Sequence, residues 1–212
     1  MEKFTALEPE KQQTILNAAL AEFAEHGFEK ASTNRIVKAA SIGKGMLFYY
    51  FKSKRDLYEY LADYSLDFVK KEYFNLVDLS ERDFIERLKK ISAIKFKAQT
   101  ENKYVFNFIG TFVLAKDATM PAHIQRKYED LQRISNKMLY EGIDLALFRS
   151  DVDVEKAFKL IRWSIEGYQN ELLQKLEGQH LASIDFDPYW QEFYSYLDIL
   201  KKSFYKEGER EA

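Results

Sequence analysis

Residues 32–51 read STNRIVKAASIGKGMLFYYF, and they predict two short helices joined by a tight turn. Ser32 or Thr33 is placed to cap the first helix, and the second helix runs from Lys44 to Phe51. A helix pair joined by three or four residues is typical of the helix-turn-helix, whose second helix lies in the major groove of DNA. The stretch therefore predicts a DNA-binding element.

The charge around this stretch favours the same interpretation. Seven basic residues and no acidic residue lie between Lys30 and Arg55. The first 55 residues hold nine basic and six acidic residues, whereas the whole chain carries a net charge of −2. A cationic patch on an acidic body directs one end of a protein toward phosphate. A solvated surface corner is the alternative for a short basic hairpin, and the helix spacing and the aromatic run argue against it.

The composition favours a helical protein. The chain has 212 residues, of which 16% are aromatic and only eight are glycine and three proline. Scarce glycine and proline favour long helices over turn-rich sheets. The absence of cysteine excludes disulfides and thiolate metal sites and fits the reducing cytoplasm, which is the location that we expect. No apolar run approaches the eighteen or so residues of a membrane span, so we expect no membrane association through such a segment.

Apolar residues recur at helical spacing along most of the chain, so we expect an all-α fold with about nine helices. Residues 1–8 are expected to form a loose arm, and Gly27 is expected to end the first long helix. Ser53 and Ser80 each precede an acidic residue by three positions, which predicts two further helix starts. Asp187 is the expected cap of the last helix, and another helix is expected from about Ala122 to Phe148.

The N-terminal part of the chain resembles the tetracycline-repressor (TetR) family of bacterial transcription regulators, over about the first quarter of the sequence. The resemblance is carried by residues 15–28, by TNRIVKAA at 33–40, by IGKGMLFYYF at 42–51 and by KSKRDL at 52–57. It implies an N-terminal three-helix helix-turn-helix domain, residues 1–52, and a C-terminal helical bundle for ligand binding and dimerisation, residues 53–212. It also implies a homodimer that reads a palindromic operator and releases it when a small-molecule effector binds.

The chain departs from the usual family pattern at several positions. Ser41 stands where a glycine commonly occupies the turn, and Met46 replaces a common threonine. Phe48 replaces a tyrosine whose hydroxyl often reaches a phosphate, so Tyr49 and Tyr50 become the expected phosphate contacts.

The predicted DNA contacts fall into two classes, because phosphate contacts fix the register and base-edge contacts specify the sequence. Phosphate contacts are assigned to Thr33, Tyr49, Tyr50, Lys52 and Lys54. Base edges are assigned to Lys44, which can donate to guanine, and to Met46, which can contact a thymine methyl. Gly45 would let the backbone approach the DNA closely, and Arg35 fits either class. Leu47 and Phe51 are expected to belong to the core.

We place the dimer interface on the last two helices, expected at 153–177 and 187–206. The second of these is apolar nearly all round, which is typical of a helix buried on several sides. The candidate interface residues are Phe158, Ile161, Ile165, Gly167, Tyr168, Trp190, Phe193 and Leu197. The alternative is that both apolar stripes serve the core of one monomer.

An effector cavity is expected near the aromatic helix 104–114. The candidate lining residues are Phe108, Phe112, Met120 and Trp163. Ionisable groups are scarce along this helix, which favours an apolar effector, although an aromatic stripe is more often plain core. The resemblance implies that such a ligand would shift the linking helix, residues 54–79, and change the spacing of the two recognition helices of a dimer.

Other classes of function have less support. Glu177 and His180 form one Glu-x-x-His pattern, but a di-iron bundle needs two copies and two further glutamates. We find no phosphate-binding glycine loop and no nucleophile elbow, so we expect no enzyme, no cofactor and no metal. A helical adaptor or membrane-surface protein without sequence-specific DNA binding remains the alternative function.

Overall fold

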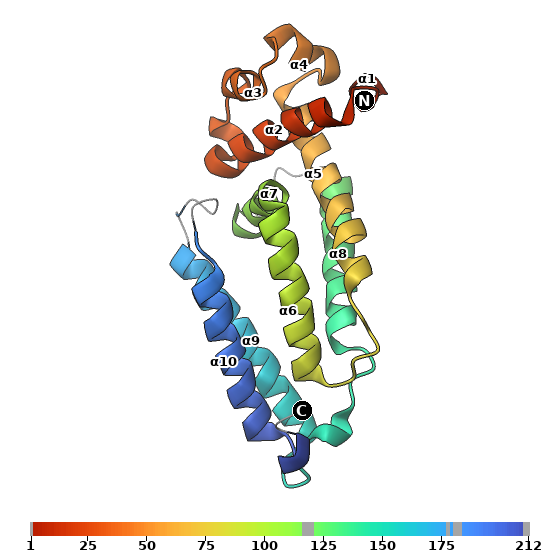
Figure 1. Cartoon of the computed structure of the whole chain (residues 1–212), viewed down its shortest axis with the longest axis vertical. Helices are drawn as coiled ribbons and strands as arrows, with labels where there is room; N and C mark the ends of the chain where they lie inside the picture. The colour runs from red at the N-terminus through yellow and green to blue at the C-terminus, as the bar shows by residue number, and fades with distance from the viewer. Residues whose placement is uncertain (1, 116–120, 177–178, 180–183, 210–212) are drawn as a thin grey trace. The chain divides into compact units, whose positions relative to one another are not determined.

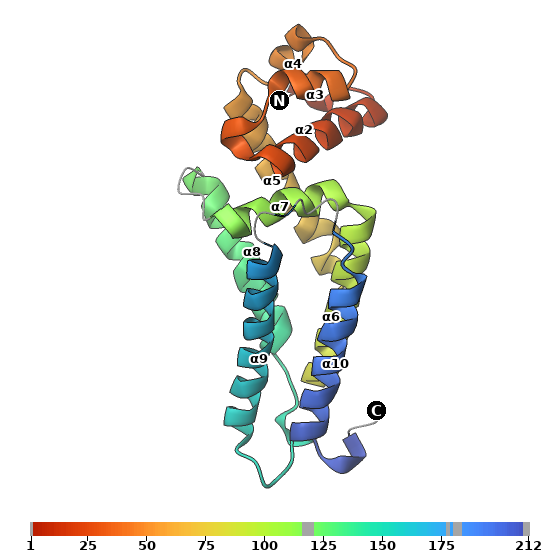
Figure 2. The same cartoon turned by 90° about the vertical axis from the view of Figure 1, so that its left-hand side faces the viewer.

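The computed structural model describes residues 2–115, 121–176, 179 and 184–209, and these residues are mainly α-helical (Figures 1 and 2). The helices are α1 (Glu2–Thr5), α2 (Pro9–Lys30), α3 (Thr33–Ala39), α4 (Lys44–Tyr50), α5 (Lys54–Glu72), α6 (Phe84–Glu101), α7 (Lys103–Ala115), α8 (Ala122–Tyr140), α9 (Val154–Leu176) and α10 (Asp187–Phe204). Short 3-10 turns lie at Phe74–Leu76, Leu145–Leu147 and Glu207–Glu209. The all-α fold class is confirmed.

The chain packs as two compact units. Most of unit 1 lies in Met1–Asn75 and Lys97–Arg133, and unit 2 is built from Leu76–Phe96, Ile134–Gln179 and Ser183–Ala212. This division follows packing, and α6 and α8 each contribute residues to both units. The functional division after residue 52 stays a prediction.

In unit 1, helix α2 packs against α3, α5 and α7. Phe23 of α2 contacts Tyr58 of α5 and Phe108 of α7, with ring centroids 5.1 and 6.3 Å away. Gly27 interrupts α2 with a φ of 66°, a left-handed conformation that favours glycine, as the sequence predicts for a helix end. Ser53 caps α5 as predicted, because its hydroxyl accepts the N–H of Asp56 at 3.0 Å.

Helix α1 corrects the expectation of a loose N-terminal arm. Phe4 is fully buried, and its ring centroid lies 4.9 Å from that of Phe51 and 5.5 Å from that of Tyr60. Burial of a phenylalanine stabilises a fold by about 2 kcal/mol, which helps to offset the entropy lost by ordering a short terminal segment. The Gln12 amide also donates to the Leu7 carbonyl at 2.7 Å and ties α1 to α2.

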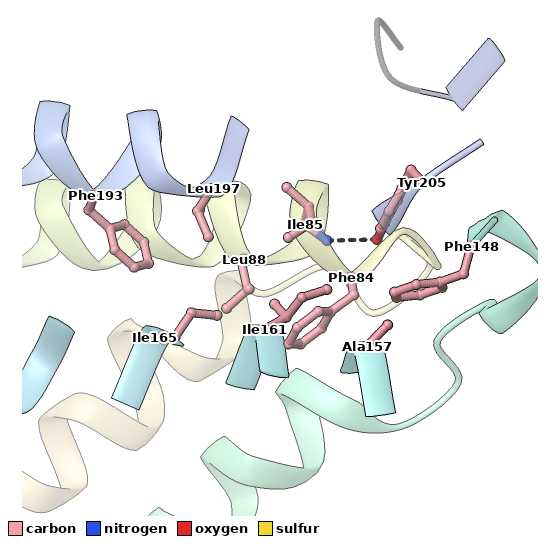
Figure 3. Close-up of a cluster of buried hydrophobic side chains, with 10 residues drawn as sticks. All are labelled: Phe84, Ile85, Leu88, Phe148, Ala157, Ile161, Ile165, Phe193, Leu197 and Tyr205. Atoms are coloured by element: carbon pink, nitrogen blue, oxygen red, sulfur yellow. Dashed lines mark hydrogen bonds between the residues drawn. The ribbon is translucent and has the colours of Figure 1, made fainter. Parts of the chain in front are cut away.

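In unit 2, helices α6, α9 and α10 enclose an apolar core (Figure 3). The buried residues of this core are Phe84, Ile85, Leu88, Phe148, Ala157, Ile161, Ile165, Phe193, Leu197 and Tyr205. The Tyr205 hydroxyl donates to the Asp83 carboxylate at 2.9 Å and accepts the Ile85 N–H at 3.4 Å, so its polar atom is satisfied inside the core. Burial raises the pKa of Tyr205, and the Asp83 charge adds to this effect.

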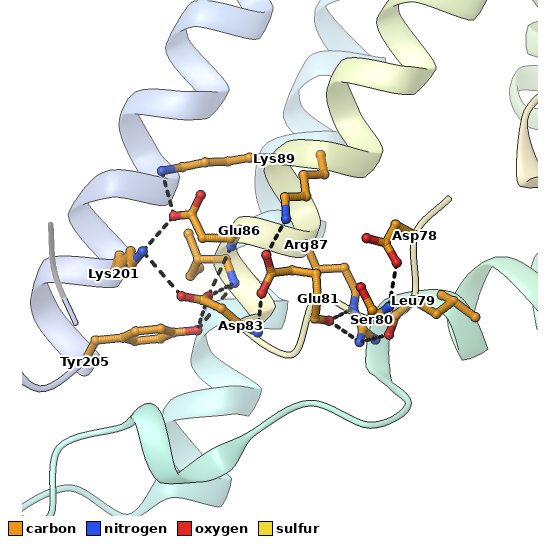
Figure 4. Close-up of polar contacts among 12 residues, drawn as sticks. Asp78, Leu79, Ser80, Glu81, Asp83, Glu86, Arg87, Lys89, Lys201 and Tyr205 are labelled. Atoms are coloured by element: carbon orange, nitrogen blue, oxygen red, sulfur yellow. Dashed lines mark hydrogen bonds and ion pairs between the residues drawn. The ribbon is translucent and has the colours of Figure 1, made fainter. Parts of the chain in front are cut away.

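A polar network lies at the α6 N-terminus of unit 2 (Figure 4). Lys201 is 3% exposed, and its Nζ lies 2.7 Å from a Glu86 oxygen and 3.3 Å from an Asp83 oxygen. Arg87 is 1% exposed and donates to backbone carbonyls. Because each buried cation has close acceptors, the desolvation of its charge is offset.

Three predicted helix ends are wrong. Asp83, not Ser80, caps α6, because its carboxylate accepts the N–H groups of the second and third helical residues. Asp187 is itself the first residue of α10, Phe186 holds the cap position, and the Asp187 N–H donates to the Asp185 carboxylate at 3.1 Å. Helix α8 ends at Tyr140 instead of continuing to Phe148, and a 3-10 turn follows. Helix ends depend on which nearby side chain or turn binds the backbone N–H and C=O groups there, and the spacing of apolar residues in the sequence does not show this.

Candidate nucleic-acid interface

Helices α3 and α4 form the predicted helix-turn-helix at one end of unit 1 (Figure 1). Leu47 and Phe51 are each 1% exposed, so the inner side of α4 is core, as expected. Ser41 in the turn has a φ of 52°, a conformation that L-residues other than asparagine and aspartate adopt rarely. A serine therefore fills a left-handed position where the resembling family commonly has glycine.

The outer side of α4 carries the predicted base contacts. Lys44, Gly45 and Met46 are exposed, and Tyr49 is 60% exposed. A Cβ added at Gly45 would meet nothing within 4 Å, so packing within the protein does not require glycine there. Among the predicted phosphate contacts, Lys52 and Tyr49 are exposed; Thr33 and Tyr50 are half-buried.

Arg35 is paired with Glu22 although its side chain is 52% exposed, so its assignment to DNA stays a prediction. Its Nε lies 2.9 and 3.0 Å from the two Glu22 carboxylate oxygens, and its Nη2 lies 2.6 Å from one of them. The same carboxylate accepts the Ser32 N–H at 2.7 Å. Burial opposes ionisation of Glu22, but the bonds from Arg35 and Ser32 outweigh it and lower the Glu22 pKa. Arg35 thus fixes α3 on α2.

Lys54 is half-buried and held by backbone carbonyls, which argues against its predicted phosphate role. Its Nζ donates to the carbonyls of Phe28, Glu29 and Ala31, at 2.7, 3.2 and 3.2 Å. These carbonyls follow the break in α2, where a helix end leaves acceptors without intrahelical partners. An ammonium has three donors, and all three have acceptors here.

The predicted dimer residues divide between the inside and the outside of unit 2. Ile161, Ile165, Phe193 and Leu197 belong to the core, and Phe158, Tyr168 and Trp190 pack against it. These seven residues contribute to the packing of the monomer, and Ile165, Tyr168, Phe193 and Leu197 also line a hollow on the outer face of α9 and α10, so their part in a dimer stays a prediction. Gly167 is exposed.

A different set of residues forms the outer face of α9 and α10. The exposed large apolar residues are Leu160, Trp163, Tyr196 and Ile199, at 46, 56, 46 and 58%. They lie on two helices that run side by side (Figure 2). A hollow of about 390 Å³ on this face is lined by Gly167, Tyr196 and Ile199, among others. An apolar surface of this kind on adjacent helices is typical of an interaction site.

The predicted ligand residues do not come together in the part of the chain that the structure describes. Phe108 is fully buried in the core of unit 1, against Phe23 and Tyr58. Trp163 lies on the exposed face of α9. Met120 and the side chain of Phe112 lie outside the described residues.

The rival functions find no site in the described ranges. No group of three or more histidine, cysteine, aspartate or glutamate side chains there is arranged to hold a metal ion. The Glu177 and His180 pattern lies outside the described residues. No described helix is long and apolar enough to cross a membrane.

The known proteins that are similar to this chain are transcription regulators. Residues 15–61 match the family described as "Bacterial regulatory proteins, tetR family". The HTH-type transcriptional repressor KstR2 of Mycobacterium tuberculosis is 28% identical over 150 residues, which are 70% of this chain and 74% of that protein. A TetR family transcriptional regulator from Chloroflexus aurantiacus superposes with a TM-score of 0.62 at 21% identity, over 97% of this chain and 98% of that one. The ketosteroid transcriptional regulator KstR2 of M. tuberculosis does so with a TM-score of 0.61 at 23% identity, over 95% and 97%.

Proposed function

We propose that the chain is a repressor of the TetR family that binds a palindromic DNA operator as a homodimer, since residues 15–61 match that family and a transcriptional repressor is 28% identical over 150 residues. The observation that carries the proposal is the division of α4 into a buried side, with Leu47 and Phe51, and an exposed side, with Lys44, Met46 and Tyr49. A helix anchored from behind with free donors in front can enter a major groove.

The DNA-binding proposal rests on a revised set of contacts. Lys44 and Met46 would reach base edges, with Gly45 allowing close approach of the backbone. Thr33, Tyr49, Tyr50 and Lys52 would contact phosphates. Lys54 would position these residues without touching the DNA, because its three donors have acceptors in the protein, whereas Arg35 pairs with Glu22 through Nε and Nη2.

Selection of duplexes from a random pool tests this proposal. The purified protein should enrich one palindromic sequence, and its affinity should fall steeply with salt. Lys44→Ala should relax the preference at one base pair in each half-site, whereas Lys52→Ala should weaken all duplexes alike. A protein that bound no duplex above the level of random sequence would contradict the proposal and leave the adaptor alternative.

The homodimer would form through the outer face of α9 and α10. Two copies of Leu160, Trp163, Tyr196 and Ile199 would bury each other, and exposed Gly167 would let the helices approach closely. A two-fold axis places the same patch opposite itself, which suits a face made of two adjacent helices. The proposed half-site spacing is about 34–36 Å, one turn of DNA.

Sedimentation at several protein concentrations tests the dimer. Ile199→Glu should shift the protein toward monomer, because it would bury a charge between the two copies. Leu145→Glu is the matched control, because Leu145 is 45% exposed in unit 2 but lies outside this face. A wild-type protein that stayed monomeric, or equal dissociation in both variants, would contradict the interface.

The effector is proposed to be a small apolar molecule, since ionisable groups are scarce along α7. Phe108 of α7 contacts Phe23 of α2, so a displacement of α7 would reach the helix that supports α3. A ligand can shift the protein only by its preference for one conformer, typically 1–3 kcal/mol. A thermal-shift panel of fatty acids, sterols and charged metabolites tests this, and stabilisation by charged metabolites alone would contradict an apolar effector.

A further inference from the structure

Helix α1 brings a cation to the recognition helix. The Nζ of Lys3 lies 4.1 Å from the ring centroid of Tyr49, which is a cation–π contact. Lys3 is exposed, and Tyr49 is 60% exposed on the outer side of α4. The ammonium of Lys3 therefore faces the Tyr49 ring at a solvent-exposed position.

The position of Lys3 is fixed by its neighbour in sequence. Phe4 is fully buried, with ring centroids 5.8 Å from Tyr50 and 4.9 Å from Phe51, the last residues of the recognition helix segment. Gln12 donates to the carbonyls of Thr5 and Leu7 at 3.2 and 2.7 Å, which holds the other end of α1. A cation on an anchored segment loses little entropy when it binds an anion.

We propose that α1 is part of the DNA-binding surface and that Lys3 binds a backbone phosphate next to the one contacted by Tyr49. This inference rests on the proposed function, and it adds a residue outside the helix-turn-helix to the contact surface. A lysine binds phosphate as a point charge and carries no base specificity, so it should strengthen binding to every duplex. The alternative role is structural, in which Lys3 only packs on the Tyr49 ring.

Salt titration of DNA binding separates the two roles. The full chain is tested as wild type, Lys3→Gln and Lys3→Arg, on the duplex that the wild type selects and on a random duplex. Glutamine keeps two of the four methylenes of lysine and removes the charge, and we expect the fold to be retained because Phe4 still anchors α1. Lys202→Gln is the matched control, because Lys202 is an exposed lysine on α10 in unit 2.

The expected result is a charge effect without loss of sequence preference. Lys3→Gln should weaken binding to both duplexes by about three- to tenfold and reduce the slope of log Kd against log salt by about one per chain. Lys3→Arg should restore both quantities, and Lys202→Gln should match the wild type.

Three other outcomes of the salt titration would contradict the role of Lys3, and one of them would also contradict the proposed function. Lys3→Gln with the wild-type salt slope, even with a lower melting temperature, would leave Lys3 a packing residue and overturn this inference alone. An equal change in Lys202→Gln would show a general charge effect and also overturn it. A wild type that binds no duplex would overturn both this inference and the proposed function.

Discussion

Lys54 in unit 1 and Arg87 in unit 2 both donate hydrogen bonds to backbone carbonyls at the end of a helix, but they differ in burial. Lys54 in unit 1 donates to the carbonyls of three residues that follow the break in α2. Arg87 in unit 2 donates to the carbonyls of Leu79, Glu81, Met138 and Glu141 (Figure 4 shows the first two). Met138 and Glu141 lie at the end of α8, so both cations bind the carbonyl end of a helix, where the macrodipole is negative.

The difference between them is the extent of burial. Arg87 is 1% exposed, whereas Lys54 is half-buried at the edge of a cationic surface. Desolvation lowers the pKa of Arg87 from its ordinary value, although nearby carboxylates oppose this effect. The comparison teaches that a basic residue in a DNA-binding segment can be committed to the protein backbone, and that only its acceptors reveal this.

Removal of Arg87 is expected to have the largest effect. Arg87→Met fills similar volume but leaves the partly buried carbonyls of four residues without this donor, and should lower the free energy of unfolding by about 3–5 kcal/mol. Urea unfolding measures it. Arg82→Met is the control, because Arg82 is exposed in the same segment and should change stability by less than about 0.5 kcal/mol. If Arg87→Met were as stable as Arg82→Met, the hydrogen bonds from Arg87 to these carbonyls would not contribute to stability.

Lys54 should give a smaller loss of stability. Lys54→Met should lower the free energy of unfolding by about 2 kcal/mol, since three carbonyls lose a charged donor at a partly exposed site. Lys52→Met, at an exposed neighbour, should leave stability within about 0.5 kcal/mol and weaken DNA binding instead. If the Lys54 variant kept its stability and lost salt dependence, Lys54 would be a phosphate contact after all.

The Glu22 carboxylate predicts a pH effect in unit 1. Its pKa is below the ordinary 4.5, because the bonds from Arg35 and Ser32 outweigh its desolvation. The stability that Glu22 contributes is therefore fully present above about pH 4.5 and is lost as the pH falls through the lower, folded-state pKa. Glu22→Gln should cost about 1 kcal/mol at neutral pH, and its unfolding free energy should fall less steeply with acid. Parallel acid profiles for the two proteins would contradict this.

Substitution of Ser41 in the turn between α3 and α4 should have the smallest effect, and it should raise the free energy of unfolding. Ser41 has a φ of 52°, and Ser41→Gly should stabilise the protein by about 0.5 kcal/mol, because relief of the left-handed strain slightly exceeds the entropy cost of glycine. Thermal unfolding measures the change. Ser195→Gly, in the interior of α10, is the control and should destabilise by about 0.5–1 kcal/mol. A lower melting temperature for Ser41→Gly would show that the serine side chain stabilises the turn.

Local sequence signals predicted much of the structure. The spacing of Leu47 and Phe51 against Lys44 and Met46 assigned the two sides of α4, because helical periodicity places such residues on opposite faces. Gly27 marked a helix end because few other residues adopt its conformation. By contrast, the apolar stripe of α10 could not be divided from sequence into buried Leu197 and exposed Ile199.

The sequence by itself determined the all-α class, the helix-turn-helix and the cationic character of its N-terminal segment, because these depend on periodicity, turn chemistry and charge along the chain. The tertiary structure alone decided which cations have acceptors within the protein and which apolar residues are exposed. Arg35 and Lys54 find their acceptors 13 and 26 residues away, and Phe4 finds its pocket beside Phe51 and Tyr60. A side chain's partner is set by the packing of distant segments, and no local pattern carries that information.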